Sequence, residues 1–338
     1  MSSFFALLKE GIMLLTKISQ FLSKYTTPVV LLFAIVAFIY APSFAWVKGS
    51  TQTVILGIIM FAMGLTLSPK DFAILAKRPT DILLGTLAQF TIMPLIAFTL
   101  VHLGLPKGIA IGLLLVGTCP GGVSSNIMSF LCKGDVAFSV GMTAVNTLLS
   151  PVLTPILMKM LAGEIVDVNA WGLFKTILCV TIFPVAGGFL LNYLLSKKQT
   201  FKRVRSWMPG VAVLGLGAIV GGVISLLGSK FFSSGAMIFL CVFLHNSLGY
   251  VAGYAIGKIA RMSKAKKRTI SIEVGMQNAG LATGLASQHF PAYPEAAVAA
   301  AISCVWHSIS GTILAGIFLL MDQRANKRMQ QDEKILTD

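Results

Sequence analysis

The segment SIEVGMQNAGL, residues 271–281, places polar side chains and glycines inside an otherwise apolar stretch near the end of the chain. It contains one carboxylate, Glu273, and two amides, Gln277 and Asn278. A carboxylate near the centre of a bilayer costs about 2.5–3.5 kcal/mol on insertion scales, so it needs a partner there. Glycines loosen the helix at the same place. The segment therefore predicts a break in a membrane helix, at which a polar site is built.

The rest of the chain has the composition of a polytopic membrane protein. Of its 338 residues, 56% are hydrophobic and only 12% are charged, whereas a soluble domain carries about a quarter charged residues. Apolar windows of about 20 residues recur along the chain, as membrane-spanning helices require. The net charge of +15 is confined to short segments between these windows, which argues against a nucleic-acid partner. We therefore expect an all-α membrane protein whose partner is the lipid bilayer, with no obligatory protein partner.

The apolar runs between charged or turn segments predict ten spans joined by short loops. They lie near residues 27–47, 51–68, 80–103, 108–131, 135–160, 169–195, 208–228, 233–257, 268–289 and 294–321. With these spans, 22 of the 27 Lys and Arg residues fall on the side of the two termini and 5 fall on the other side. Because basic residues favour the cytoplasmic side, both termini are expected in the cytoplasm, and the protein in a bacterial inner membrane.

Ten spans divide into two groups of five, and an odd number per group inverts the second group relative to the first. The two predicted repeats cover residues 27–161 and 168–322. Residues 1–26 carry apolar residues at helical spacing with lysines between them, and this amphipathic segment is expected to lie uncleaved on the inner membrane surface. Residues 323–338 are expected to form a solvated cytoplasmic tail. Inverted repeats are the usual architecture of secondary transporters.

The fourth span of each half carries a candidate break. The first break is TCPGGVSSN, residues 118–126, in which Pro120 removes a backbone donor and two glycines follow. The second break lies within the opening segment. A half-helix that begins after a break exposes its N–H groups and the positive end of its dipole. The two half-helices would begin near Val123–Ser124 and Asn278–Ala279, so an anionic substrate fits between them.

Oxygen-bearing side chains gather around the two breaks. Hard cations select oxygen ligands from carboxylates, amides, hydroxyls and carbonyls. No Lys or Arg lies at the depth of Glu273, so a bound cation or a proton is its expected partner. Taken singly, a hydroxyl in a membrane helix usually bonds to a carbonyl of its own helix. The candidate ligands beside Glu273 are Gln89, Ser125, Asn126, Ser139 and Thr143.

Two stretches resemble the bile acid:sodium symporter (BASS) family. They are CPGGVSSNIMSFLCKGDVAFSV and TAVNTLLSPVLTP, within residues 119–155, and SIEVGMQNAGLATGLA, residues 271–286. With the ten-span layout, the match covers nearly the whole chain from about residue 27. The resemblance implies a two-part body: spans 1, 2, 6 and 7 form a panel, and the others form a core in which the broken fourth and ninth spans cross.

The resemblance also implies two coupling sodium ions and one substrate site. The first ion would be held by Ser125, Asn126, Ser139, Thr143 and Glu273. The second would be held by Gln89, Glu273, Gln277 and the main-chain carbonyls of Val274 and Met276. Substrate would lie between panel and core, near Val123, Ser124, Asn278, Ala279, His307 and Ser308.

The leading interpretation is a sodium-coupled symporter that works by alternating access and is not an enzyme. Its substrate would be an organic anion, either bile acid-like or a small monocarboxylate such as pantoate or ketopantoate. Three alternatives remain open at this point. A proton-coupled carrier would use Glu273 as its relay, an arsenite-type extruder would use Cys119 as a soft ligand, and an intramembrane protease would need a Ser125–His307 dyad. The five cysteines form no CxxC pair, so neither disulfides nor a zinc site is indicated.

Overall fold

The computed structural model describes residues 2–69, 77–122, 124–227 and 230–337. Within these ranges the chain is helical apart from turns and one isolated bridge, so the expected all-α class is confirmed. The first half contains α1 (Ser2–Lys24), α2 (Thr26–Ile39), the 3-10 turn η1 (Ala41–Ser43), α3 (Ser50–Thr66), α5 (Pro79–Val101), α6 (Lys107–Thr118), α7 (Ser124–Leu131) and α8 (Val136–Ala162). The second half contains α9 (Ala170–Ile177), the π-helical η2 (Leu178–Ile182), α10 (Phe183–Leu195), α11 (Gln199–Leu227), α12 (Lys230–Ile259), α13 (Lys264–Gly275), α14 (Ala279–His289) and α15 (Pro294–Thr337).

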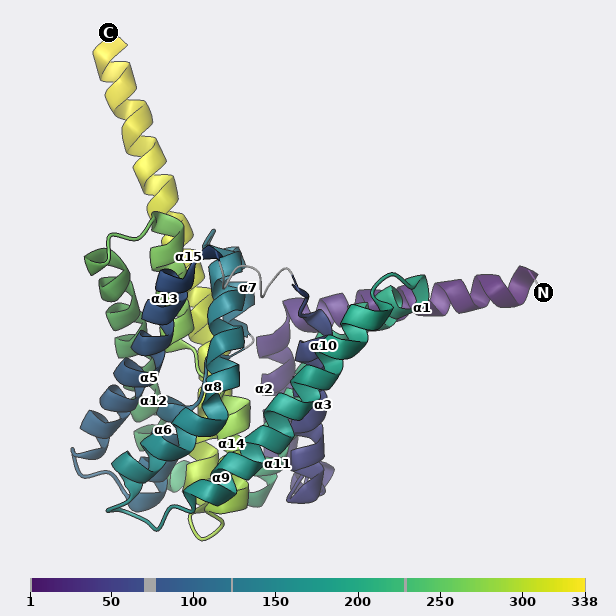
Figure 1. Cartoon of the computed structure of the whole chain (residues 1–338), viewed down its shortest axis with the longest axis vertical. Coiled ribbons are helices and arrows are strands. Elements are labelled where there is room, and N and C mark those ends of the chain that lie inside the picture. The colour runs from purple at the N-terminus through teal and green to yellow at the C-terminus, as the bar shows by residue number, and fades with distance from the viewer. Residues whose placement is uncertain (1, 70–76, 123, 228–229, 338) are drawn as a thin grey trace.

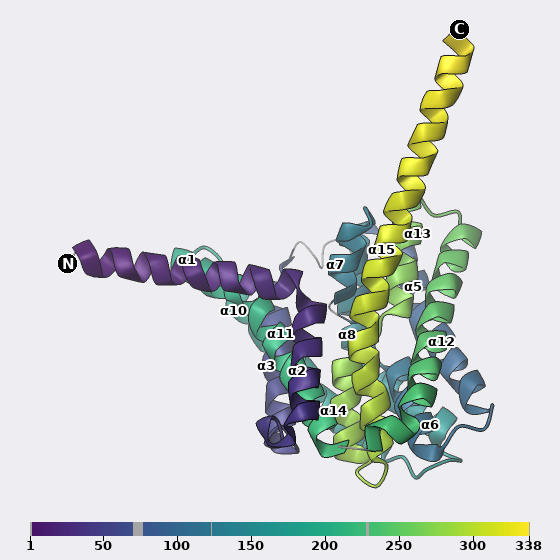
Figure 2. The same cartoon turned by 180° about the vertical axis from the view of Figure 1, so that it is seen from behind.

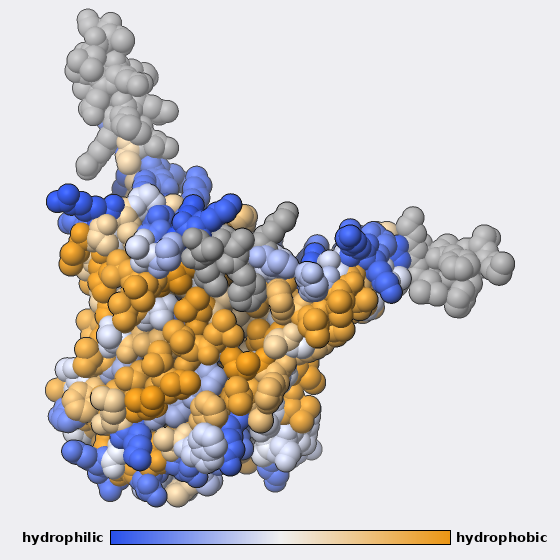
Figure 3. Space-filling view, in the orientation of Figure 1, coloured by the Kyte–Doolittle hydropathy of each residue, from blue (hydrophilic) through white to orange (hydrophobic). Residues whose placement is uncertain are grey.

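Among the described residues, six helices are long and apolar enough to cross a membrane: α5, α8, the continuous segment α9–η2–α10, α11, α12 and α15. A seventh candidate joins α1 and α2, which bend by 84° where they meet. Two further apolar helices, α3 and α6, are shorter. Figure 3 shows an apolar band across the face in view, with hydrophilic residues above and below it. The chain is therefore a multi-pass membrane protein.

The two ends of the chain emerge on the same side of this band (Figure 1). There α1 projects sideways from the bundle, whereas α15 continues upward out of it (Figure 1). The last expected span and most of the expected tail form this one helix, which runs from Pro294 to Thr337. The first expected span is shorter than its apolar run, because α2 ends at Ile39. Pro42 follows three residues after this end and has no N–H with which to continue the helical hydrogen bonds.

The helices form two groups that face each other (Figures 1 and 2). In the first group, α3 packs against α10 and α11, and α2 packs against α11. In the second group, α5, α6, α8, α12, α13, α14 and α15 pack against one another. Contacts of α11 with α14 and α15, and of α3 with α14, join the two groups.

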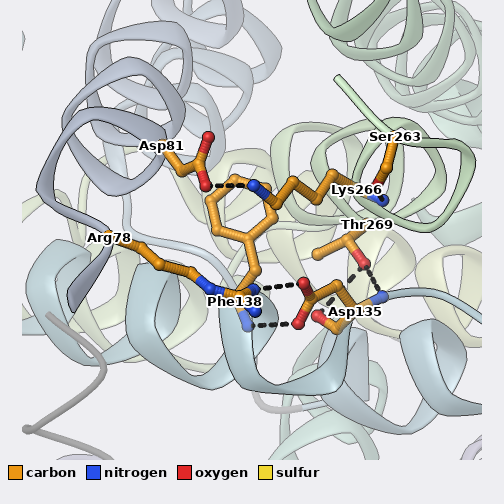
Figure 4. A network of polar contacts seen from close by, with 7 residues as sticks. All are labelled: Arg78, Asp81, Asp135, Phe138, Ser263, Lys266 and Thr269. Atoms are coloured by element: carbon orange, nitrogen blue, oxygen red, sulfur yellow. Dashed lines mark hydrogen bonds and ion pairs between the residues drawn. The ribbon is translucent and has the colours of Figure 1, made fainter.

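Three contacts join the beginnings of α5, α8 and α13 (Figure 4). Arg78, the residue before α5, forms an ion pair with Asp135, which caps α8. Lys266, in the first turn of α13, pairs with Asp81 in the first turn of α5. The main-chain N–H of Asp135 donates to Thr269 Oγ1 over 2.8 Å. The three helices therefore start at the same end of the molecule and lie in register.

The last helix is tied to the same end of α13. Arg268 is buried, and its two terminal guanidinium nitrogens donate to the carboxylate of Asp322 over 2.9 and 2.6 Å. Lys264 pairs with the same carboxylate. Arg268 also donates to the main-chain oxygen of Phe318 over 3.1 Å. Every ion pair between described residues lies at this end of the molecule, away from the break that follows α13.

Candidate functional site

Two interrupted helices meet inside the second group. The first interruption separates α6, which ends at Thr118, from α7, which begins at Ser124. The second separates α13, which ends at Gly275, from α14, which begins at Ala279. Both predicted breaks are thus confirmed, and both half-helices start where the sequence placed their N-termini.

The two unwound segments bond to each other through their main chains. The N–H of Gly122 donates to the carbonyl of Met276 over 2.9 Å, and the N–H of Asn278 donates to the carbonyl of Pro120 over 2.7 Å. A Cβ atom added to Gly122 would lie 2.8 Å from the carbonyl oxygen of Gln277, so only glycine permits this approach. One N–H and one carbonyl freed by each break are therefore satisfied by the other break, as an apolar surrounding requires.

The side chain of Glu273 lies next to the crossing and is completely buried. Three hydroxyl groups surround its carboxylate. Ser125 Oγ lies 2.6 Å from Oε1 and Thr143 Oγ1 lies 3.0 Å from Oε2, while Ser139 Oγ donates to Oε1. Ser139 Oγ also lies 2.7 Å from Asn126 Oδ1. The five residues predicted to hold the first ion therefore form one cluster.

This cluster has more oxygen lone pairs than hydroxyl protons. The three hydroxyls contact both oxygens of Glu273, Oδ1 of Asn126, and the main-chain oxygens of Gly122 and Ser139. The Gly122 oxygen also accepts from the N–H of Ser125, and the Ser139 oxygen lies inside α8, so neither depends on the hydroxyls. Each hydroxyl donates a single proton, whereas an ionised carboxylate and an amide oxygen together offer about six lone pairs. Glu273 has no ion pair among the described residues. A surplus of oxygen lone pairs around a buried carboxylate is the environment that a hard cation prefers.

The residues predicted for the second ion also come together. Gln89 is completely buried on α5, and its Nε2 donates to Gln277 Oε1 and, over 3.3 Å, to the carbonyl of Cys119. Gln277 Nε2 donates to the carbonyl of Val274 over 2.6 Å. The carbonyl of Met276 lies at the same break, where it accepts the hydrogen bond from the N–H of Gly122 described above. Gln89 Oε1 has no hydrogen-bond partner among the described residues, so one buried oxygen is left available.

Two of the residues predicted to contact substrate lie at the second break. His307 Nδ1 lies 3.3 Å from the carbonyl oxygen of Gln277, and its Nε2 has no partner within the described part of the chain. Asn278 caps α14, because its Oδ1 accepts a hydrogen bond from the N–H of Leu281 over 3.1 Å. The histidine thus has one free ring nitrogen, whereas the oxygen of the amide is occupied.

The other four predicted substrate residues differ in their surroundings. Ser124 and Ala279 are the first residues of α7 and α14. Ser308 Oγ bonds within its own helix, to the carbonyl of Cys304 at 3.4 Å. Val123 lies outside the described residues.

Comparison with known proteins identifies the family. The family model of the sodium bile acid symporters matches residues 53–234. The chain belongs to this family. It is 44% identical over 303 residues to the uncharacterized sodium-dependent transporter YocS of Bacillus subtilis, with 89% of this chain and 93% of that protein covered. It is 40% identical over 277 residues to the chloroplastic probable sodium/metabolite cotransporter BASS1 of Arabidopsis thaliana, with 82% and 68% covered.

Membership of the sodium bile acid symporter family confirms the expected class: the chain is a sodium-dependent solute transporter and not an enzyme. The contacts of the serine and the histidine agree with this. Ser125 bonds to Glu273, whereas His307 bonds to the main chain of Gln277, so the two side chains have separate partners. No hydrolytic dyad is formed by them.

Two polar residues that the sequence did not single out support the breaks of this family member. Thr154 Oγ1, on α8, donates to the carbonyl of Thr118 over 2.7 Å. Asn246 Nδ2, on α12, donates to the carbonyl of Gly275 over 2.8 Å. Each side chain therefore satisfies the last carbonyl before a break. Neither contact could be predicted from the sequence, because each depends on which helix packs beside the break.

Proposed function

We propose that the chain is a sodium-coupled symporter that carries two sodium ions with one organic anion by alternating access. The observation that carries this proposal is the environment of Glu273, whose buried carboxylate has oxygen neighbours and no charged partner among the described residues. A cation bound there would balance the charge. Sodium fits because every group around it is a hard oxygen donor.

The first ion would bind between Glu273 and the hydroxyls and amide of Ser125, Ser139, Thr143 and Asn126. The excess of oxygen lone pairs over hydroxyl protons in this cluster supports the assignment. The second ion would bind at Gln89, Gln277 and Glu273, together with the carbonyls of Val274 and Met276. Support for this assignment comes from Gln89 Oε1, a buried oxygen without a partner among the described residues.

The substrate anion would bind where α7 and α14 begin. Both helices start at the crossing of the breaks, and the positive ends of their dipoles favour a negative charge. The residues around it would be Val123, Ser124, Asn278, Ala279, His307 and Ser308. Since His307 Nε2 is free among the described residues, this ring nitrogen is available to a carboxylate.

Ten spans in two inverted repeats provide the architecture for alternating access. The helix α2, the short α3 and the two interrupted pairs α6–α7 and α13–α14 would add four spans to the six long ones. The repeats would cover residues 27–161 and 168–322, between the surface segment 1–26 and the cytoplasmic tail 323–338. The group of α2, α3, α10 and α11 would be the panel, and the rest the core. The basic residues favour a bacterial inner membrane with both termini inside.

A small metabolic monocarboxylate such as pantoate or ketopantoate is the substrate we favour, with bile acids as a further possibility. The support is the description of several relatives as sodium/metabolite cotransporters. The family match favours sodium over the two alternatives, a proton as sole coupling ion and arsenite export.

Uptake by the purified protein in liposomes tests the proposal. Radiolabelled pantoate, pyruvate and taurocholate would each be offered at constant pH with an inward gradient of either sodium or potassium. We expect sodium alone to drive accumulation of at least one of them. Glu273→Gln should abolish this accumulation, whereas the matched control Glu295→Gln, at the start of α15, should retain it. Uptake driven by a pH gradient without sodium would instead make Glu273 a proton relay.

A further inference from the structure

Asn146 is a buried amide that the site described above does not use. It lies on α8, is completely buried, and neither of its amide atoms has a hydrogen-bond partner in the described part of the chain. An amide side chain offers two N–H donors and a carbonyl oxygen. Buried polar groups are almost always paired, so an amide with no partner at all points to a ligand that binds there.

The position of Asn146 on α8 directs it toward the ion cluster. Seven residues separate it from Ser139, and at about 100° per residue this spacing returns to nearly the same face of the helix. Thr143 lies on that face as well, one turn before Asn146. Both hydroxyls contact Glu273. Asn146 therefore continues the line of ligands that α8 presents to the carboxylate.

The depth of Asn146 matches that of Gln89 on the neighbouring helix. The beginnings of α5 and α8 are joined by the pair Arg78–Asp135 (Figure 4). Gln89 follows Arg78 by 11 residues, and Asn146 follows Asp135 by the same number. At 1.5 Å per residue, both side chains start about 16 Å from this joint.

Contacts further along the helices keep the same register. A Cβ atom on Gly85 would lie 2.4 Å from Sδ of Met142, and one turn later the two helices reach Gln89 and Asn146. On the other side, α8 meets α13 where Thr143 Oγ1 contacts Glu273. Continuing along both segments by about one turn leads to Asn146 and Gln277. Two independent contacts thus place Asn146 at the level of the Gln89–Gln277 pair.

We infer that Asn146 Oδ1 is a further ligand of the sodium ion held by Gln89 and Gln277. The ion would then be surrounded by oxygens from α5, α8 and the unwound end of α13. Two buried amide oxygens without partners among the described residues, one on Gln89 and one on Asn146, are thereby explained by one cation. This inference rests on the proposed sodium coupling, and it adds a ligand from a third helix to that site.

Thermal unfolding of the purified full-length protein over a series of NaCl concentrations tests the inference, with KCl holding the ionic strength constant. An ion that binds only the folded state raises the unfolding temperature. Asn146→Leu keeps a side chain branched at Cγ and removes the oxygen. We expect it to raise the sodium concentration for half of the stabilisation about tenfold, which corresponds to about 1.4 kcal/mol. Thr181→Val is the matched control, because Thr181 is also buried with an unpaired hydroxyl among the described residues, but lies in η2.

Asn146→Asp separates a ligand from a merely polar side chain. It retains an oxygen at the same position, so the sodium response should persist, whereas Asn146→Leu should weaken it. An unchanged response in Asn146→Leu would overturn the inference, and so would equal weakening in Asn146→Asp and Asn146→Leu. If sodium fails to stabilise even the unmodified protein, the proposed sodium coupling itself is wrong. Asn146→Ala also removes the oxygen and should weaken the sodium response in the same way, so it keeps the test decisive if the leucine variant does not fold.

Discussion

At the scale of single residues, a substitution of Thr143 tests whether its hydroxyl is an ion ligand or only bonds to its own helix. Its Oγ1 contacts both Glu273 Oε2 and the carbonyl of Ser139. Thr143→Val keeps the shape and removes this oxygen, so we expect the sodium concentration for half-maximal uptake to rise about tenfold, the change that about 1.4 kcal/mol of binding produces. Thr283→Val is the control, because Thr283 is equally buried and its hydroxyl bonds to the carbonyl of Ala279 in its own helix, not to Glu273. Equal effects of both substitutions on sodium dependence would contradict the ligand role.

The sequence predicted the residues of the oxygen cluster better than their hydrogen bonds. Ser139 and Thr143 lie four apart and had to share a helix face, and a lone carboxylate at Glu273 required oxygen neighbours. Which oxygen is free, however, depends on packing between helices. The oxygen of Asn278 is used to cap α14, and Asn146 was overlooked although its spacing from Ser139 signals the same face.

At the scale of helices, the contact between the two breaks gives a direct prediction for Gly122. A Cβ atom added at Gly122 would lie 2.8 Å from the carbonyl oxygen of Gln277. Gly122→Ala must push the unwound segments apart and displace Gln277 from Gln89, so we expect uptake to be lost while the protein still inserts and purifies. Gly316→Ala is the matched control, since nothing lies within 4 Å of a Cβ at Gly316. Transport by Gly122→Ala at the unmodified rate would show that the close approach is dispensable.

Helix breaks were predictable, whereas helix ends at the membrane boundary were not. Pro120 and the two glycines that follow it mark the first break by their backbone chemistry alone. The extension of α15 to Thr337 had no such signal, because the polar residues that suggest a solvated tail are also good helix formers. The pairing of Asp322 with Arg268 then ties this extension to α13, a contact that only the packed structure reveals.

At the scale of the whole molecule, the arrangement of basic residues predicts which loops face the cytoplasm. Glu164 and Gln199 are both exposed and flank the α9–α10 segment: Glu164 lies in the loop before it, and Gln199 is the first residue of α11 after it. In a variant without the five native cysteines, a membrane-impermeant maleimide should label Glu164→Cys in intact cells and should label Gln199→Cys only after the membrane is opened. Labelling of Gln199→Cys alone in intact cells would invert the proposed topology.

The charges at the site also predict that transport moves net charge across the membrane. Two sodium ions beside the single carboxylate of Glu273 would leave the site with a charge of +1, and a bound monoanion would bring it to zero, which favours passage through a region of low dielectric constant. Each cycle would then carry two positive charges and one negative charge inward. A membrane potential would contribute about 2.3 kcal/mol per 100 mV for that one net charge.

Proteoliposomes with a fixed sodium gradient and an imposed potassium diffusion potential measure this directly. An inside-negative potential should speed the accumulation of a monoanion such as pantoate, and an inside-positive potential should slow it. Asn126→Ala weakens the first ion site by removing an amide oxygen, so it should require more sodium while keeping the same response to potential at saturating sodium. Uptake that does not respond to the potential would mean that the charges of the transported ions cancel. Either one sodium ion moves with each monoanion, or the substrate is a dianion. If one sodium ion moves with each monoanion, the two-ion assignment around Glu273 and Gln89 would have to be withdrawn.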